Sequence, residues 1–144
     1  MRTLLLVAAL ALALLGLVAV GSAIGDELPE VGFQTDTISI VESAEQVNLD
    51  ITLTISSTQT VTVGFNTREG TALAGQDYVS ATGILQFTPG ITLQTVSVMV
   101  LDDVLPEQDE SFSLVLTGAQ NAALGLYPTM TVTITDDGSR YVVI

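Results

Sequence analysis

The chain has 144 residues, of which 48% are hydrophobic and 16 are Asp or Glu; the only basic residues are three Arg, with no Lys, His or Cys. This composition excludes imidazole bases, thiolates, disulfides, Schiff-base amines and Cys/His zinc sites. The formal net charge of -13 excludes nucleic acid as a partner, because affinity for a polyanion comes mainly from Lys and Arg. Cations are the partners that this charge favours.

The N-terminus is predicted to be a secretory signal peptide, residues 1–23. Arg2 precedes an unbroken apolar stretch, Leu4 to Val20, and small residues at 21–23 suit cleavage by signal peptidase. The stretch also reaches the lower limit for a membrane span, so an uncleaved membrane anchor is the alternative. Either interpretation predicts export of the rest of the chain. The protein would be secreted or lie at the extracytoplasmic cell surface, held by the membrane only if this segment is retained.

The remaining chain is predicted to contain a polar linker (24–30), one domain (31–138) and a C-terminal tail of unassigned role (139–144). Within the domain, hydrophobic residues alternate with polar residues, and this period of two predicts β-strands. The clearest strand runs from Val47 to Ile55. In chain order, the seven predicted strands centre on residues 38–40, 47–55, 61–65, 85–87, 96–100, 112–116 and 130–134.

Seven strands with one hydrophobic face each cannot bury those faces in a single open sheet, so we expect an all-β sandwich of two antiparallel sheets. If consecutive strands run antiparallel, their connections alternate between the two ends of the sandwich. The loops at one end (56–60, 88–92 and 117–127) then contain no acidic residue. The opposite end receives 11 of the 16 acidic residues: Glu42, Glu45, Glu69, Asp77, Asp102, Asp103, Glu107, Asp109, Glu110, Asp136 and Asp137.

Such a concentration of carboxylates predicts a bound cation. Two carboxylates about 4 Å apart repel by roughly 4 kcal/mol at an effective dielectric constant of 20. Calcium suits them best, because it takes six to eight oxygen ligands in flexible geometry, whereas magnesium requires near-octahedral geometry and transition metals favour His or Cys. The alternative is a solvated acidic end that aids solubility. A glycosidase is disfavoured because no Trp is present to line a sugar site, and we expect no enzyme.

Several spaced motifs strongly resemble the Calx-beta domain, a family known from sodium/calcium exchangers, integrin β4 and bacterial surface proteins. The motifs lie at residues 70–78, 83–90, 102–112 and 132–137. The resemblance implies an immunoglobulin-like seven-strand β-sandwich that binds Ca²⁺ in loops at one end and serves cell adhesion or communication. By matching positions, it implies that the calcium ligands are Glu42, Asp77, Asp102, Asp103, Glu107, Glu110, Asp136 and Asp137.

Two positions depart from the exchanger-like pattern, which often has a third Asp in each acidic run. Val104 and Gly138 stand there, so we expect fewer ions or weaker binding, because the number of ligand charges tunes calcium affinity. The alternative function is a structural or adhesive module that binds another surface protein without metal.

The aromatic residues and glycines of the motifs have structural interpretations. Tyr78, Phe87 and Phe112 are predicted to lie in the core. Gly75, Gly83 and Gly90 are predicted to occupy turns or bulges with positive φ.

Overall fold

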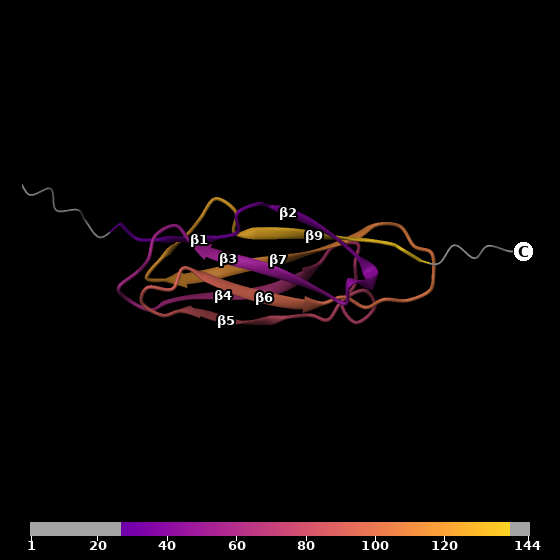
Figure 1. Cartoon of the computed structure of the whole chain (residues 1–144), viewed down its shortest axis with the longest axis horizontal. Coiled ribbons are helices and arrows are strands. Elements are labelled where there is room, and N and C mark those ends of the chain that lie inside the picture. The colour runs from indigo at the N-terminus through magenta and orange to yellow at the C-terminus, as the bar shows by residue number, and fades with distance from the viewer. Residues whose placement is uncertain (1–26, 139–144) are drawn as a thin grey trace, which may run out of the picture.

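The computed structural model describes residues 27–138, which form an elongated sandwich of two β-sheets (Figure 1). One sheet has four strands in the order β6-β3-β1-β8, and the other has five in the order β2-β9-β7-β4-β5. The elements are β1 (Glu30–Gly32), β2 (Thr37–Val41), the short 3-10 helix η1 (Glu42–Ala44), β3 (Gln46–Leu53), β4 (Val61–Glu69), β5 (Thr82–Phe87), β6 (Leu93–Met99), β7 (Glu110–Gln120), β8 (Ala123–Leu124) and β9 (Thr129–Thr135).

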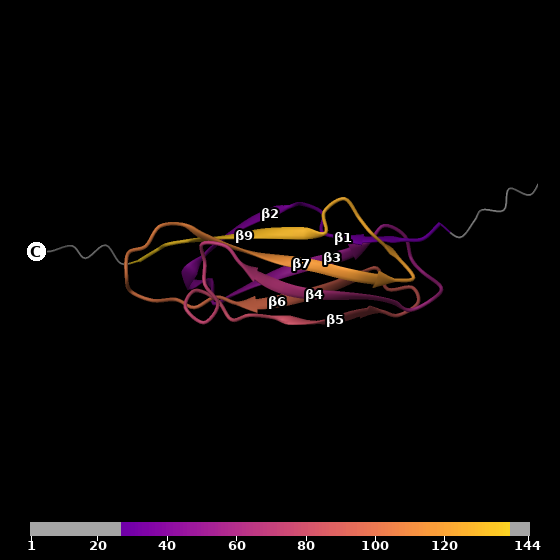
Figure 2. The same cartoon turned by 180° about the vertical axis from the view of Figure 1, so that it is seen from behind.

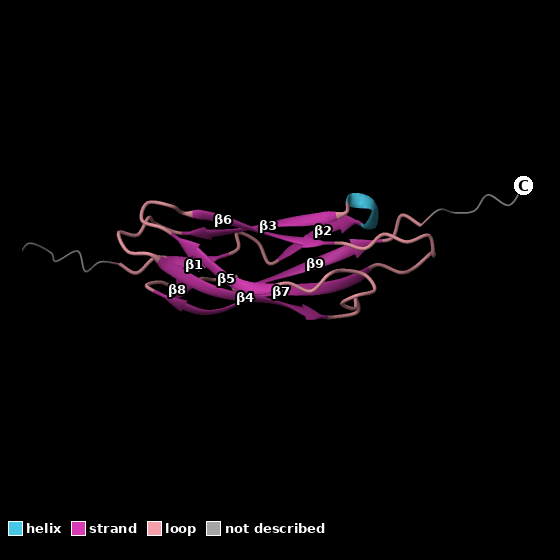
Figure 3. Ribbon diagram, turned by 90° about the horizontal axis from the view of Figure 1, so that it is seen from below, coloured by secondary structure: helices cyan, strands magenta, loops and turns pink. Residues whose placement is uncertain are grey.

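The alternating residues form the core between the two sheets, as the sequence predicts. In β3, every second residue from Val47 to Leu53 is buried, and the residues between them are exposed or half-buried. In β9, buried Met130, Val132 and Ile134 alternate with half-buried threonines. Thr suits these outward positions because its β-branched side chain favours extended backbone. Figure 3 shows the two layers that enclose this core.

Two short strands, β1 and β8, were not predicted, so the sandwich has nine strands rather than seven. β1 pairs antiparallel with β3 and parallel with β8. Strands of two or three residues are too short to show a period in the sequence. A second difference concerns Ile55, which lies beyond the end of β3 and is 44% exposed instead of belonging to the strand.

The strand directions confirm the expected alternation, but the prediction of two antiparallel sheets is wrong, because each sheet also contains one parallel pair, β1 with β8 and β2 with β9. β2 and β9 lie side by side and run parallel over five residue pairs, from Thr37 opposite Thr131 to Val41 opposite Thr135. β7 lies between β9 and β4 and runs antiparallel to both (Figure 2). As a result, η1, the 70–81 loop, the 100–109 loop and residues 136–138 all lie at one end of the sandwich, which we call the acidic end.

The predicted core aromatics are buried. The ring of Tyr78 stacks on that of Phe112, with centroids 4.1 Å apart and an interplanar angle of 13°. Phe87 is fully buried in β5. Because Tyr78 belongs to the 70–81 loop and Phe112 to β7, this stack fixes the loop against the sheet.

Two of the three glycine predictions are correct. Gly75 and Gly90 both have φ of +86°, a conformation that glycine adopts at little energetic cost. The prediction for Gly83 is wrong, because its φ is not positive and it lies within β5. A Cβ atom there would come within 2.9 Å of the Phe65 ring, so a larger residue would force that ring to shift.

The expected signal peptide or anchor and the C-terminal tail lie outside the described residues, as do residues 24–26 of the expected linker. Glu30, the last residue of the expected linker, is the first residue of β1. Within residues 27–138, no helix has the length and apolar character needed to cross a membrane.

Candidate metal centre

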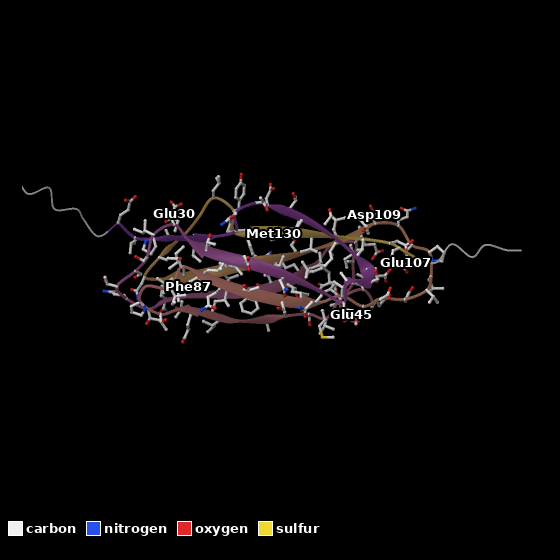
Figure 4. All side chains as sticks on the ribbon, in the orientation of Figure 1. Glu30, Glu45, Phe87, Glu107, Asp109 and Met130 are labelled. Carbon is white, nitrogen blue, oxygen red and sulfur yellow. The ribbon has the colours of Figure 1, made fainter. Side chains whose placement is uncertain are left out.

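The acidic end brings together carboxylates from four segments that are distant in sequence. η1 supplies Glu42, the 70–81 loop supplies Asp77, and residues 136–138 supply two adjacent aspartates. The remaining acids come from the 100–109 loop and the start of β7. Figure 4 shows Glu107 at this end and Glu30 near the other.

Six of the eight predicted ligands form two compact groups. Group 1 consists of Glu42, Asp102 and Asp137, and group 2 consists of Asp77, Glu107 and Glu110. Within each group, one carboxylate oxygen from every residue lies within 4.8 Å of the others. Oxygens that bind one calcium ion at 2.3 to 2.6 Å can be at most about 5 Å apart. Each group therefore has the spacing required to share an ion.

The other two predicted ligands, Asp103 and Asp136, lie beside these groups and hold the loops in place. Asp136 accepts hydrogen bonds from the backbone N–H of Glu107 (3.1 Å) and of Gly138 (2.6 Å). Asp103 accepts one from the backbone N–H of Leu105 (2.6 Å). The Asp136 carboxylate thus bridges two segments and that of Asp103 fixes a local turn, and each keeps lone pairs that a cation can use.

Glu42 is the only buried charged residue among those described, with 6% of its surface exposed. β2 runs directly into η1 and delivers this side chain beneath the 100–109 loop, where its Oε1 accepts a hydrogen bond from the N–H of Asp103 (3.2 Å). Burial raises the pKa of Glu42, and repulsion from Asp103, Asp102 and Glu107 raises it further. A buried carboxylate among like charges requires a proton or a cation to offset them.

Two carboxyl groups of group 2 also have raised pKa values. The pKa of Glu110 is raised by burial, then by a hydrogen bond with Asp77 and by repulsion from Asp77, Glu107 and Glu42. The pKa of Glu107 is also raised, first by desolvation and then by Asp103, Asp77 and Asp136. Glu107 is exposed, so solvent screens much of this repulsion.

These raised pKa values predict that the calcium-free domain becomes less stable as pH rises above the unfolded carboxyl value of 4.5. The folded state holds protons on Glu42, Glu107 and Glu110 more tightly than the unfolded state does. Its stabilisation is therefore complete below the unfolded value of 4.5 and is lost as pH rises through the raised values. Urea unfolding in chelator at several pH values would measure the free energy of unfolding. Replacing Glu42 and Glu110 by Gln should weaken the dependence of this free energy on pH. A rise in stability toward neutral pH would contradict the prediction.

A small cleft lies at group 2 and extends to Glu42 of group 1. It is lined by Glu42, Asp136, the three residues of group 2, Gln108 and Ile134, and its volume is ≈ 10 Å³. This volume is about that of one water-sized sphere. Two further polar residues lie at this site and are not among the predicted ligands. Gln108 lines the cleft, and the Ser43 hydroxyl donates a hydrogen bond to Asp137.

The other three acidic residues of this end, Glu45, Glu69 and Asp109, belong to neither group and are not among the predicted ligands. Asp109 and Glu45 are exposed. Glu69 accepts a hydrogen bond from the backbone N–H of Ala74 (3.1 Å) and braces the 70–81 loop. Glu45 has φ of 64°, and its carbonyl accepts a hydrogen bond from the N–H of Val100 (2.9 Å). That bond ties the end of η1 to the start of the 100–109 loop.

Comparison with known proteins identifies the family. A family model described as the Calx-beta domain matches residues 25–138. The chain belongs to the Calx-beta domain family. Three of the motifs through which the sequence resembles that family, at residues 70–78, 102–112 and 132–137, contribute to its acidic end.

The relatives of this Calx-beta chain include exchangers and a matrix protein. Sodium/calcium exchanger 1 of Canis lupus familiaris is 33% identical over 131 residues, covering 78% of this chain and 14% of the exchanger. FRAS1-related extracellular matrix protein 2 of Homo sapiens is 38% identical over 121 residues, covering 79% of this chain and 4% of that protein. The chain thus spans only a small part of the length of these relatives.

Solved structures of Calx domains have the same fold. The apo-form Calx CBD1 domain superposes with a TM-score of 0.74 at 28% identity, covering 77% of this chain and 99% of that domain. A structure titled as the calcium binding domain CBD12 of CALX1.1 gives a TM-score of 0.72 at 28% identity, covering 75% of this chain and 46% of the other.

Proposed function

We propose that the chain is an exported calcium-binding module without catalytic activity. The observation that carries this proposal is the grouping of six carboxylates from four segments into two sets with the oxygen spacing of a calcium site. Asp103 and Asp136 complete the proposed ligand set. Calcium would cancel the repulsion at the acidic end and hold its loops together, so binding would change rigidity rather than drive turnover.

Membership of the Calx-beta family supports this proposal, since one related structure is titled a calcium binding domain. The relationship to an extracellular matrix protein supports a role in cell-surface adhesion or communication. We further propose that residues 1–23 are a signal peptide or anchor, 24–30 a linker, 31–138 the calcium-binding domain and 139–144 a tail. A surface protein is a second proposed partner.

The rival function is a metal-free structural module with a solvated acidic end. The observation that favours it is the exposure of half the proposed ligands, Asp102, Asp103, Glu107 and Asp137. Burial of Glu42 favours the calcium-binding function instead, because solvation does not offset the charge of a buried carboxylate.

Calorimetric titration of the decalcified protein distinguishes these two functions. We expect saturable heat with calcium and little with magnesium, which retains its water and requires octahedral geometry. Glu110→Gln should weaken calcium binding by about tenfold or more, equivalent to about 1.4 kcal/mol, because it removes one charged ligand from group 2. Glu30→Gln is the matched control, since it removes one exposed carboxylate from the opposite end. Absence of saturable calcium binding, or an equal effect of both variants, would reject the proposed site.

A further inference from the structure

The chain changes sheets between β1 and β2, and this crossover leaves two strand edges open on the same side of the sandwich. β1 pairs with only two residues of β3, Leu53 and Thr52. After Gly32 the chain passes to the other sheet and continues as β2, whose only strand partner among the described residues is β9. The rest of the β3 edge and the outer edge of β2 therefore face each other without a strand between them.

The hydrogen bonds between β2 and β9 show to which side of β2 each backbone polar group points. The carbonyl of Asp36 accepts a hydrogen bond from the N–H of Thr131 (2.7 Å), and the carbonyl of Ile40 accepts one from the hydroxyl of Thr135 (3.2 Å). Backbone polar groups point to alternate sides along a strand. The even-numbered residues of β2 thus direct their polar groups toward β9, and the odd-numbered residues direct theirs away from it.

The open edge of β2 presents the N–H groups of Thr37, Ser39 and Val41 and the carbonyl of Ser39. The Thr37 carbonyl receives only a side-chain hydrogen bond, from the Thr35 hydroxyl at 3.2 Å. Natural edge strands are usually protected by Lys, Pro, inward charges or bulges. Residues 37–41, with the sequence TISIV, contain no charged residue or proline, so β2 lacks this protection.

The β3 edge presents backbone groups to the same space. The N–H of Thr54 donates to the carbonyl of Glu30 (2.9 Å), so even-numbered residues of β3 face the β1 side. Asn48 and Asp50 follow this alternation, but they lie beyond the last residue that pairs with β1. Their backbone polar groups therefore point into the space between the two strands.

A groove with a volume of ≈ 690 Å³ occupies this space and is lined by residues of both β2 and β3. This volume falls within the range of about 300 to 1,000 Å³ that is typical of binding pockets. Apolar atoms of Ile38, Leu49, Leu53 and Met130 line it, together with polar side chains. The groove thus combines apolar contacts with an open strand edge.

We propose that this groove binds an extended segment of a partner protein that adds to β2 as a further strand. Backbone hydrogen bonds to Thr37, Ser39 and Val41 would supply affinity, and alternate apolar side chains would enter the groove. The charge of the groove and of the whole chain predicts which other residues the partner segment carries. Asp50 lines the groove, the chain carries a net charge of -13, and Arg68 is the only basic residue of the described part. The segment therefore carries Lys or Arg, which an acidic surface attracts.

An NMR experiment on the purified exported chain tests this proposal independently of calcium. The probe is an acetylated and amidated heptapeptide in which Val and Thr alternate between two terminal Lys residues. We expect it to slow amide hydrogen exchange at Thr37, Ser39 and Val41 by about tenfold or more, while Ile38 and Ile40, already bonded to β9, change little. A peptide with Glu in place of both Lys should bind more weakly.

Two substitutions of one residue separate backbone pairing from side-chain contact. Ser39→Pro removes an N–H from the open edge and should abolish peptide binding. Ser39→Ala keeps that N–H and should bind like the unmodified protein. Equal binding by both variants would overturn the proposal, as would unchanged exchange in the unmodified protein. If Ser39→Pro does not fold, the exchange measurement decides alone. Protection of the odd-numbered amides without peptide, together with a dimer in sedimentation, would assign the edge to a second copy and also overturn the proposal.

Discussion

Calcium at a hundredfold excess over its Kd is expected to raise the free energy of unfolding by about 2.7 kcal/mol. For a domain of this size, that gain corresponds to a rise in Tm of about 10 °C. The physical reason is that an ion shared within group 1 or group 2 binds the folded state and replaces repulsion between carboxylates by attraction. Thermal melts with calcium, magnesium and chelator at equal ionic strength would measure the shift. Superimposable curves with calcium and with chelator would show that calcium does not bind.

One double variant is expected to change Tm differently with calcium and with chelator. Asp102→Asn with Glu110→Gln removes one carboxylate from each group while conserving side-chain volume. With calcium, the variant should lose the rise in Tm because each group has lost a charged ligand. With chelator, it should melt at a higher temperature than the unmodified protein, because the repulsion that raises the pKa of Glu110 is relieved.

Two other carboxylates provide the matched control for this double variant. Glu27→Gln with Glu30→Gln removes the same charge from exposed positions away from the acidic end, and it should leave the calcium response intact. A rise in Tm that persists in the Asp102 and Glu110 variant would place the ion elsewhere.

Replacing Tyr78 by Ala is expected to destabilise the domain by about 3 to 5 kcal/mol, the usual loss when a large aromatic side chain is removed from a core. Tyr78 is 1% exposed and stacks on Phe112. Because a domain is typically stable by only 5 to 15 kcal/mol, this loss removes a large part of the total. Urea unfolding in chelator would measure it.

Tyr78→Phe is the matched control for this core substitution. It keeps the stacked ring and removes only the hydroxyl group, so we expect a loss of about 1 kcal/mol. Tyr78→Ala should also weaken calcium binding, because Asp77 precedes it in the 70–81 loop and the stack fixes that loop. Similar stability losses in both variants would show that the stack contributes little.

The alternation of apolar and polar residues was sufficient to predict the sandwich and the directions of its main strands. Val47 to Leu53 and Met130 to Ile134 repeat with a period of two, and only two facing sheets can bury so many one-sided strands. Strand direction then followed from chain order, so the clustering of Glu42, Asp77 and Asp137 at one end required no knowledge of the pairing. The three-residue β1 and two-residue β8 could not be predicted, because their existence depends on tertiary contacts with β3 and with each other.

The candidate site was predictable as a set of residues but not as two groups. Which oxygens approach within 4.8 Å depends on backbone turns such as η1, which buries Glu42, and on side-chain directions that sequence spacing does not determine. Gly83 shows the same limit, because its packing against Phe65 depends on a neighbouring strand. The groove beside β2 arises from the change of sheet after Gly32, for which the sequence carries no periodic signal.

The parallel pairing of β2 with β9 has a mechanical consequence. The described chain enters near one end of the sandwich and leaves at the other (Figure 1). Once the short pairings of β1 with β3 and β8 have broken, tension between Glu27 and Gly138 pulls β2 and β9 along their own axes in opposite directions. All five residue pairs between Thr37 and Val41 and their β9 partners then bear the load together in shear, instead of opening one after another. Such an arrangement resists forced unfolding.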